Sequence, residues 1–192
     1  VRVAGVAGSN PVIPILSFIK KGKIMLNEKM EFAFNEQINK EFYSEFLYLA
    51  MKAKFAEMNL QGFVNWLDVQ VQEERAHAFG MYDYVIERGG KIELMTIDKP
   101  EIKGTTPVQI FEHILEHEQY VTSRINYLLD VAEEVKDRAA TSFLDWYLKE
   151  QVEEESSVGK GLATLKLIGE DKNALLLLDK DLATRVFNAP VI

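Results

Sequence analysis

The chain has 192 residues, 47% of them hydrophobic, which is enough to bury one sizeable core in a single domain. It contains no cysteine, so disulfides, zinc–thiolate sites, iron–sulfur clusters and thiol nucleophiles are excluded. Its net charge of −8 argues against binding to nucleic-acid backbones, and no apolar run is long enough to cross a bilayer. We therefore expect a cytoplasmic protein with no nucleic-acid partner and no membrane partner.

Residues 1–24 differ from the rest of the chain. They contain four basic residues and no acidic one, and their apolar residues follow no helical period. Most of the basic residues come after the apolar stretch, whereas in a secretory signal they precede it. We expect this segment to be a flexible extension, or an over-translated stretch upstream of Met25. Residues 25–192 would then form the folded domain.

The rest of the chain has the pattern of long helices. Asn27 can cap the first helix, which we expect to run to about residue 58. After a short turn at residues 59–62, the second helix runs to Arg88, where a Gly-Gly pair provides a stop. An 18-residue link, residues 89–106, then separates the second helix from the third.

The third helix begins with a capping-box sequence. Thr106 can cap it, Pro107 takes the first helical position, and Gln109 completes the box. We expect this helix to end near Glu134. Asp137 can then cap a fourth helix that runs to about residue 168.

A short fifth helix follows Gly169 over residues 173–186, and we expect its apolar run ALLLL to pack at an interface. Short turns make the first helix antiparallel to the second and the third antiparallel to the fourth. The long link can travel the full length of a bundle. The prediction is therefore an all-α four-helix bundle with one long crossover and a short C-terminal helix.

Each long helix places polar residues among its core-facing apolar positions. In chain order these residues are Glu41, Glu74 with His77, Glu118, and Gln151 with Glu154. An unpaired charge in a core is very costly, so the four carboxylates predict a positive partner. Two divalent cations would balance four carboxylates, and one imidazole with oxygen donors suits iron or manganese. We predict a dinuclear carboxylate site that is bridged by Glu74.

The two halves of the chain repeat this pattern. Glu41 precedes Glu74 by 33 residues, and Glu118 precedes Gln151 by the same number. The halves are therefore pseudo-repeats of one helical hairpin, and each would contribute half of the site. The run KEQVEEE at residues 149–155 also crowds like charges on one helix, which is unfavourable unless a cation lies against them.

Four segments resemble the signature segments of bacterial-type non-haem ferritins, which belong to the ferritin-like di-iron carboxylate family. They are NEQINKEFYSEFLYLAM (35–51), QVQEERAHAF (70–79), EHEQYV (116–121) and FLDWYLKEQVEEE (143–155). The likeness extends over about residues 25–187. It implies a ferritin-like bundle and a ferroxidase that oxidises Fe(II) with O₂ or H₂O₂. It also implies a homo-oligomeric cage of 24 subunits that stores ferric mineral.

The resemblance also assigns roles to residues in the oxidation site. The first iron would be held by Glu41, Glu74 and His77. The second would be held by Glu74, Glu118 and Glu154, with Gln151 beside it. Two aromatic residues match those found near the oxidation site of the family, Tyr48 and Trp146.

A third iron site, closer to the interior of the cage, is implied by the same resemblance. It would use Glu73, Glu150 and Glu153. The sequence pattern alone leaves another interpretation open, in which these three side chains lie on a solvent-exposed surface.

Other polar residues on these helices have simpler interpretations. His113 and His117 lie four residues apart but off the stripe of Glu118, so we expect a surface or subunit-contact role rather than metal binding. Glu45 lies near the metal-facing side of its helix. We expect it to pair with a lysine, such as Lys52, rather than to bind metal.

Three other functions fit the sequence less well. A di-iron oxygenase or rubrerythrin-like peroxidase would have Glu-x-x-His in both halves, but the second half reads Gln-x-x-Glu. A haem-bearing bacterioferritin would have a methionine between Glu74 and His77, where Arg75 and Ala76 stand, so we expect no haem. A purely structural cage would lack the inward ligands.

Overall fold

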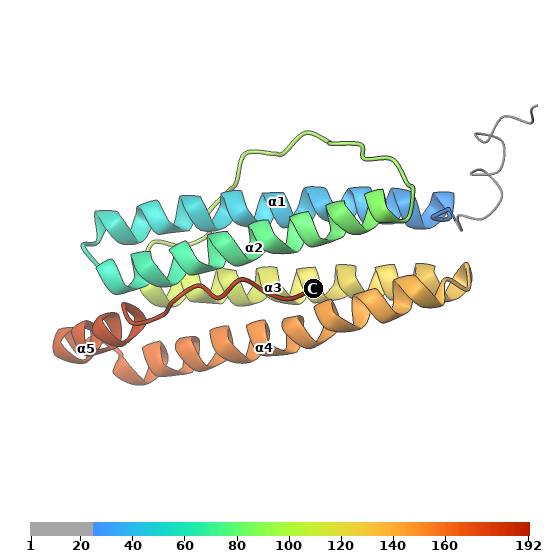
Figure 1. The fold of residues 1–192 in the computed structure, drawn as a ribbon. Coiled ribbons are helices and arrows are strands. Elements are labelled where there is room, and N and C mark those ends of the chain that lie inside the picture. The colour runs from blue at the N-terminus through green and yellow to red at the C-terminus, as the bar shows by residue number, and fades with distance from the viewer. Residues whose placement is uncertain (1–24) are drawn as a thin grey trace, which may run out of the picture.

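The computed structural model describes residues 25–192, so the expectations for residues 1–24 lie outside the described part of the chain. The helices are α1 (Glu28–Glu57), α2 (Gln61–Glu87), α3 (Pro107–Glu134), α4 (Arg138–Ile168) and α5 (Lys172–Leu182). Figure 1 shows the four long helices side by side, with α5 across one end. The predicted all-α bundle with a short fifth helix is confirmed. None of the helices in residues 25–192 is long and apolar enough to span a membrane.

The helix starts are set by the predicted capping residues. Asn27 accepts a hydrogen bond from the backbone N–H of Lys29 at 2.9 Å, and Asp137 accepts one from Ala140 at 3.0 Å. Thr106 begins α3 with the predicted capping box and with proline in its first turn. These side chains satisfy backbone N–H groups that have no partner within the helix.

Helix α2 has no side-chain cap of its own, and α5 supplies one. The backbone N–H groups of Gly62 and Phe63 donate to Asp179 Oδ1 at 2.7 and 3.1 Å. The contact requires glycine at position 62, because a Cβ there would lie 1.5 Å from the carbonyl oxygen of Asp179. The first turn of α2 therefore provides both the hydrogen-bond donors and the space that the docked α5 requires.

The chain leaves α5 at Leu182, earlier than the predicted end near residue 186. Asn65 of α2 donates to the carbonyl oxygens of Leu182 and Arg185 at 3.1 and 2.9 Å, and so holds a turn there. Figure 1 shows the following segment running back along the bundle between α2 and α4. These two helices are widely spaced: within residues 25–192 no Cα atom of one lies within 8 Å of the other.

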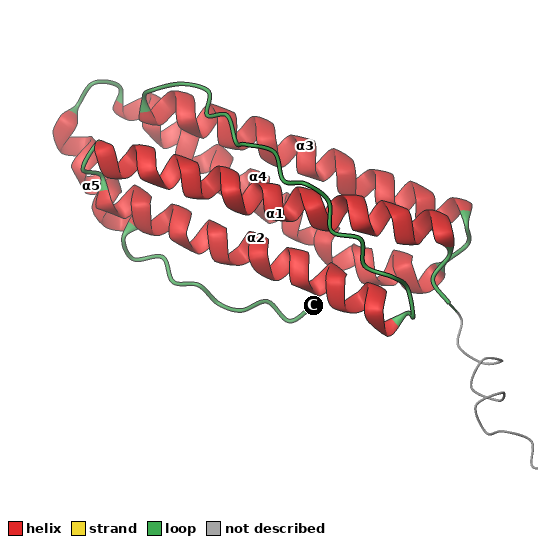
Figure 2. Ribbon diagram, turned by 90° about the horizontal axis from the view of Figure 1, so that it is seen from above, coloured by secondary structure: helices red, strands yellow, loops and turns green. Residues whose placement is uncertain are grey.

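The long crossover link lies along α1, as Figure 2 shows. Three polar residues at successive turns of α1 hold its backbone: Glu31, Asn35 and Asn39. Asn35 donates to the carbonyl oxygen of Lys91 at 2.9 Å and accepts from the N–H of Glu93 at 2.7 Å. The predicted single crossover is therefore confirmed.

The core consists of two apolar clusters with a polar layer between them. Phe34 lies in one cluster, while Phe55 and Phe63 stack in the other with ring centroids 4.7 Å apart. On α1 the polar stretch 41–45 falls between these clusters. The two apolar clusters hold the helices together at both ends of the bundle. Their packing can offset the free-energy cost of burying ionisable side chains in the middle.

Candidate metal centre

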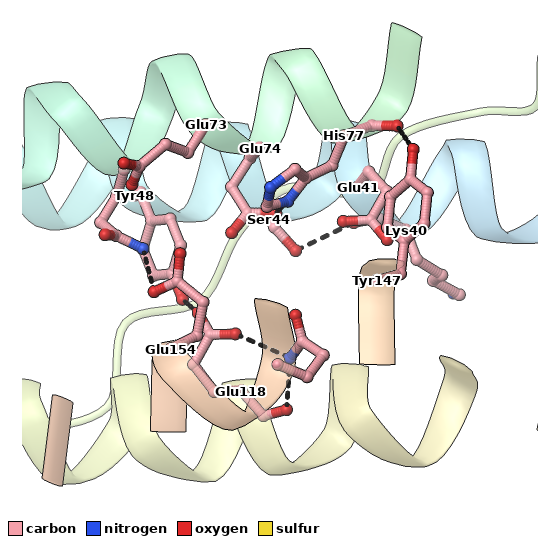
Figure 3. A network of polar contacts seen from close by, with 12 residues as sticks. Lys40, Glu41, Ser44, Tyr48, Glu73, Glu74, His77, Glu118, Tyr147 and Glu154 are labelled. Carbon is pink, nitrogen blue, oxygen red and sulfur yellow. Dashed lines mark hydrogen bonds and ion pairs between the residues drawn. The ribbon is translucent and has the colours of Figure 1, made fainter. Parts of the chain in front are cut away.

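The polar layer contains every residue that the sequence placed in the dinuclear site. Each of them is at most 4% exposed: Glu41, Glu74, His77, Glu118, Gln151 and Glu154. Figure 3 shows the side chains from α1 and α2 facing those from α3 and α4 across the interior of the bundle. The helical register therefore turns all six inward, as the positions of the apolar residues predicted.

The tightest group comes from α1 and α2. Glu41, Glu74 and His77 each offer one ligand atom, and these atoms lie within 4.8 Å of one another. Three buried polar atoms of this group have no hydrogen-bond partner: Glu41 Oε2, Glu74 Oε2 and His77 Nε2. Buried polar atoms without a partner are rare and costly in folded proteins. Two carboxylate oxygens and an imidazole nitrogen are together a suitable donor set for a divalent transition metal.

The carboxylates from α3 and α4 are arranged differently. Glu118 accepts hydrogen bonds from the hydroxyl of Tyr48 and, at 3.2 Å, from the amide of Gln151. Glu154 accepts one from the amide of Gln70 at 3.0 Å. The structure thus buries these residues beside the first group, with both oxygens of Glu118 and Oε2 of Glu154 already engaged by protein donors.

The electrostatics reflect several buried acids in one place. Burial, followed by repulsion from Glu154, raises the pKa of Glu118 to about 8. Burial, followed by repulsion from Glu118 and Glu41, raises the pKa of Glu74 well above its usual range. Without a cation the site therefore holds protons at neutral pH, and a bound cation would take their place.

Aromatic side chains surround both parts of the site. The Trp146 ring lies edge-on to His77 with centroids 5.6 Å apart, and the Tyr147 hydroxyl donates to the carbonyl oxygen of His77 at 2.9 Å. Tyr48 is fully buried beside Glu118, and burial raises the pKa of its hydroxyl well above its usual value. Tyr48 and Trp146 thus lie next to the polar layer, where the sequence analysis expected them.

The three residues of the predicted third site are near one another but unequally buried. Glu73 is half-buried and pairs with Arg185 at 2.7 Å, whereas Glu150 is half-buried and Glu153 is exposed. Burial raises the pKa of Glu73 to about 7, Arg185 opposes this, and repulsion from Glu154 and Glu150 adds to it. A cation at this position would therefore compete with the Arg185 guanidinium.

Of the two roles predicted for His113 and His117, the surface position is wrong, because both are buried, and the subunit contact stays a prediction. His113 Nδ1 accepts a hydrogen bond from the N–H of Lys103 in the crossover link at 3.1 Å. His117 Nε2 lies 2.8 Å from Ser44 Oγ, and burial lowers the pKa of His117 to about 4. The link and α1 cover a face of α3 that the sequence pattern alone left open.

The predicted pairing of Glu45 with Lys52 is also wrong. Glu45 accepts a hydrogen bond from Arg75 Nε of α2 at 3.1 Å, and Lys52 pairs with Asp68 of α2. Seven residues along a helix are two turns, a rise of about 10 Å, so a partner on the adjacent helix is nearer.

Two glutamines in the polar layer escaped the sequence analysis. Gln37 donates to Glu41 Oε1 at 2.7 Å, and Gln70 makes the bond to Glu154 described above. Both are fully buried. A signal was present, because Gln37 and Gln70 are 33 residues apart, as Glu41 and Glu74 are.

Comparisons with known proteins agree with this geometry. Residues 32–168 match the protein-family model of the ferritin-like domain. A bacterial non-heme ferritin of Bacteroides fragilis is 38% identical over 161 residues, which cover 84% of this chain and 100% of that protein. Another, of Staphylococcus saprophyticus, is 41% identical over 164 residues, which cover 85% of this chain and 98% of that protein.

Solved structures show the same relationship in three dimensions. An open-pore ferritin from the hyperthermophilic archaeon Archaeoglobus fulgidus superposes with a TM-score of 0.83 at 49% sequence identity, over 84% of this chain and 99% of that chain. A form of the A. fulgidus ferritin engineered to be closed gives a TM-score of 0.83 at 48% identity, over 85% of this chain and 99% of that chain. Family model, sequence relatives and fold all coincide on the segment that carries the polar layer, and the chain therefore belongs to the ferritin family.

Proposed function

We propose that the protein is a cytoplasmic iron-storage ferritin. It oxidises Fe(II) with O₂ or H₂O₂ at a dinuclear carboxylate centre and deposits ferric mineral inside a 24-subunit cage. The observation that carries this proposal is the group of three unpartnered buried atoms, Glu41 Oε2, Glu74 Oε2 and His77 Nε2. Burying polar atoms without partners lowers the free energy of unfolding, and a bound cation would supply the missing partner.

Iron is the substrate of this reaction. The first Fe(II) binds Glu41, Glu74 and His77, and the second binds Glu74, Glu118 and Glu154, with Gln151 beside it. Each Fe(II) gives up one electron, and O₂ takes two electrons and two protons to leave as H₂O₂. When H₂O₂ is the oxidant, it takes two electrons and two protons and leaves as two water molecules. The protons held by the raised-pKa carboxyls Glu74 and Glu118 are released when iron binds.

Release of the oxidised iron is part of storage. The second position has no imidazole ligand, and protein donors already engage both oxygens of Glu118 and one oxygen of Glu154. Such a position binds iron less firmly than a pair of Glu-x-x-His motifs would. Glu73, Glu150 and Glu153 then offer a third iron site on the way to the cage interior. Haem has no ligand in this scheme, since Arg75 stands beside Glu74 and pairs with Glu45.

Assembly into a cage is supported by the surface of the subunit. Large apolar side chains are exposed on α1 and α2, including Phe32, Phe46 and Phe79. On α5, Leu176 and Leu177 are 53% and 63% exposed. A surface with several apolar regions is typical of subunits that contact several neighbours.

The decisive experiment is an anaerobic Fe(II) titration of the iron-free protein, followed by stopped-flow mixing with O₂. We expect saturation at two Fe(II) per subunit, a fast ferric absorbance phase, and one O₂ consumed for every two Fe(II) in the first turnover. Light scattering or electron microscopy on the same sample should show the cage. Oxidation at the rate of free Fe(II) in buffer would contradict the proposal.

A further inference from the structure

Two buried glutamines connect the candidate metal centre to two arginines. On the first path, Arg124 of α3 donates from Nη2 to Glu36 at 3.3 Å and from Nε to Gln37 Oε1 at 3.4 Å. Gln37 then donates from Nε2 to Glu41 Oε1 at 2.7 Å. We call this chain of three contacts the Glu41 relay.

The second path has the same order of groups. Arg185 donates from Nη2 to Glu73 at 2.7 Å and from Nη1 to Gln70 Oε1. Gln70 then donates from Nε2 to Glu154 Oε2 at 3.0 Å. We call this the Glu154 relay. Its guanidinium also lies over the ring of Trp66, with Cζ 4.9 Å from the ring centroid.

The chemistry of these groups determines how each amide is oriented. Arginine carries only donors, so the amide oxygen of the glutamine must face it. The amide NH₂ is then left for the carboxylate, which can only accept when it is ionised. Each arginine donates to a glutamate and to the amide oxygen of the glutamine. This contact orients the buried amide so that its NH₂ group faces the carboxylate of the candidate ligand.

The consequence is visible at Glu41. Its Oε1 is bound to Gln37, while its Oε2 has no partner. The relay thus directs one oxygen to the protein and leaves the other for a ligand. Groups outside the coordination shell commonly orient ligands in this way, and their loss typically costs about 10- to 100-fold in metal affinity.

The two relays differ in how their arginines are held. Arg124 belongs to a long helix of the bundle. Arg185 lies beyond the end of α5, in the turn that Asn65 ties down through the carbonyl oxygens of Leu182 and Arg185. The second relay consequently depends on docking of α5 against α2, including the contact of Asp179 with the first turn of α2.

We infer that Arg124 with Gln37, and Arg185 with Gln70, are two independent sets of positioning residues, one for each metal position of the dinuclear centre. The Glu154 relay makes the second position depend on the docked C-terminal segment, whereas the Glu41 relay is internal to the bundle. This inference rests on the proposed function. It assigns a separate positioning role, one for each metal position, to residues that do not touch iron.

Zinc titration of the iron-free, full-length cage tests the inference without oxidation chemistry. Calorimetry would give the affinity of each binding step, and anomalous diffraction at the zinc edge would assign the steps to positions. We expect Arg185→Met to weaken Zn²⁺ binding at the Glu154 position by about 10-fold and to leave the other position within about two-fold. Arg124→Met should weaken Zn²⁺ binding at the Glu41 position by about 10-fold and leave the Glu154 position within about two-fold.

A second pair of variants separates positioning from simple loss of charge. Gln70→Met and Gln37→Met leave both arginine–glutamate pairs in place, and each should reproduce the loss of its own relay. In the double variant Arg185→Met/Gln70→Met the losses should not add, because both changes break one path. Arg88→Met, which removes an ion pair with Asp137 at 2.8 Å, is the matched control and should change neither position.

The outcomes are distinct for the relays and for the metal centre. Wild-type protein that binds two Zn²⁺ with affinities unchanged in the relay variants would overturn the relays and leave the proposed function intact. Equal losses at both positions, or additive losses in the double variant, would also overturn them. Wild-type protein that binds no Zn²⁺ at Glu41 or Glu154 would overturn the proposed function and the relays together.

Discussion

The two halves of the metal centre carry similar ligands in different states. In the α1–α2 half, Glu41, Glu74 and His77 each keep a buried atom without a partner. In the α3–α4 half, Glu118 and Glu154 already accept hydrogen bonds from protein donors. The internal repeat in the sequence suggests equivalent halves, but within residues 25–192 only the α1–α2 half has fully buried ligand atoms without a partner.

This difference separates the two positions in affinity. An atom with no partner gains the whole interaction with a cation, whereas an oxygen that already accepts a hydrogen bond gains less. A net hydrogen bond contributes about 0.5–1.5 kcal/mol, and about 1.4 kcal/mol corresponds to a factor of ten in binding. We therefore expect a tight first position and a weaker second one, as the proposed release of oxidised iron to storage requires.

The largest effect should come from Glu74, which the proposed function assigns to both metal positions. Glu74→Ala would then remove a ligand from each, and we expect the initial rate of Fe(II) oxidation in stopped-flow absorbance to fall by more than about 100-fold. His77→Ala should have a comparable effect through the first position alone. Both cages should still assemble, because each change removes a buried polar atom that has no hydrogen-bond partner.

An exposed glutamate on α3 provides the matched control for this comparison. Glu133→Ala removes a carboxylate outside the polar layer and should oxidise Fe(II) at the wild-type rate. Wild-type initial rates in Glu74→Ala would show that oxidation takes place elsewhere.

The next effect concerns protons in the α3–α4 half. The pKa of Glu118 is about 8 in the fold, above its usual value of 4.5, so between these limits the folded state binds more protons than the unfolded state. The free energy of unfolding of the iron-free protein should therefore fall as pH rises from about 5 to about 8. The expected slope is about 1.4 kcal/mol per pH unit for each such proton.

Melting curves of the iron-free cage across this pH range would measure the slope. Glu118→Gln removes the titrating group and should flatten the curve. Saturating Zn²⁺ should raise stability most at the high end of the range, because the cation then displaces fewer protons. Stability that increases steadily from pH 5 to 8 would contradict this account of the buried acids.

A smaller effect should distinguish the halves directly. Tyr48→Phe removes a hydroxyl that donates to Glu118 and lowers the pKa of that carboxyl. Without this hydroxyl the pKa of Glu118 rises, so more protons must leave before a cation binds at neutral pH. We expect this effect to outweigh the freed oxygen and to weaken binding at the second position by several-fold, with a loss of about 1 kcal/mol in the free energy of unfolding. Calorimetric Zn²⁺ titration should show the first position unchanged. Tyr120→Phe, at an exposed tyrosine, is the control, and a loss confined to the first position would argue against the assignment.

The smallest effect on the first turnover should come from the outer acids. The double variant Glu150→Ala/Glu153→Ala leaves the buried layer complete, so its initial oxidation rate should stay within about two-fold of wild type. The ratio of iron oxidised to oxygen consumed, or the later mineralisation, should change instead. Simultaneous oxygen-electrode and absorbance traces would measure both. Loss of the fast first phase would place these side chains in the dinuclear centre.

The helices and the inward orientation of the candidate ligands could be predicted from the sequence alone. Asn27, Thr106 and Asp137 cap their helices as predicted, and Glu41 and Glu118 face inward because they share a helical stripe with apolar residues. These features depend on contacts within one or two turns, or on the helical period alone. Such information can be read directly along the chain.

The contacts between side chains of different helices could not be predicted, because they depend on the packing of the whole bundle. It buried His117 against Ser44, gave Glu45 an arginine partner on the next helix, and brought Arg185 to Gln70 from 115 residues away. Pairings of this kind depend on how the helices rotate and pack against one another, and no local pattern records that. The same physics separates the two halves of the centre, because a ligand's hydrogen-bond donor is set by whichever side chain the fold places beside it.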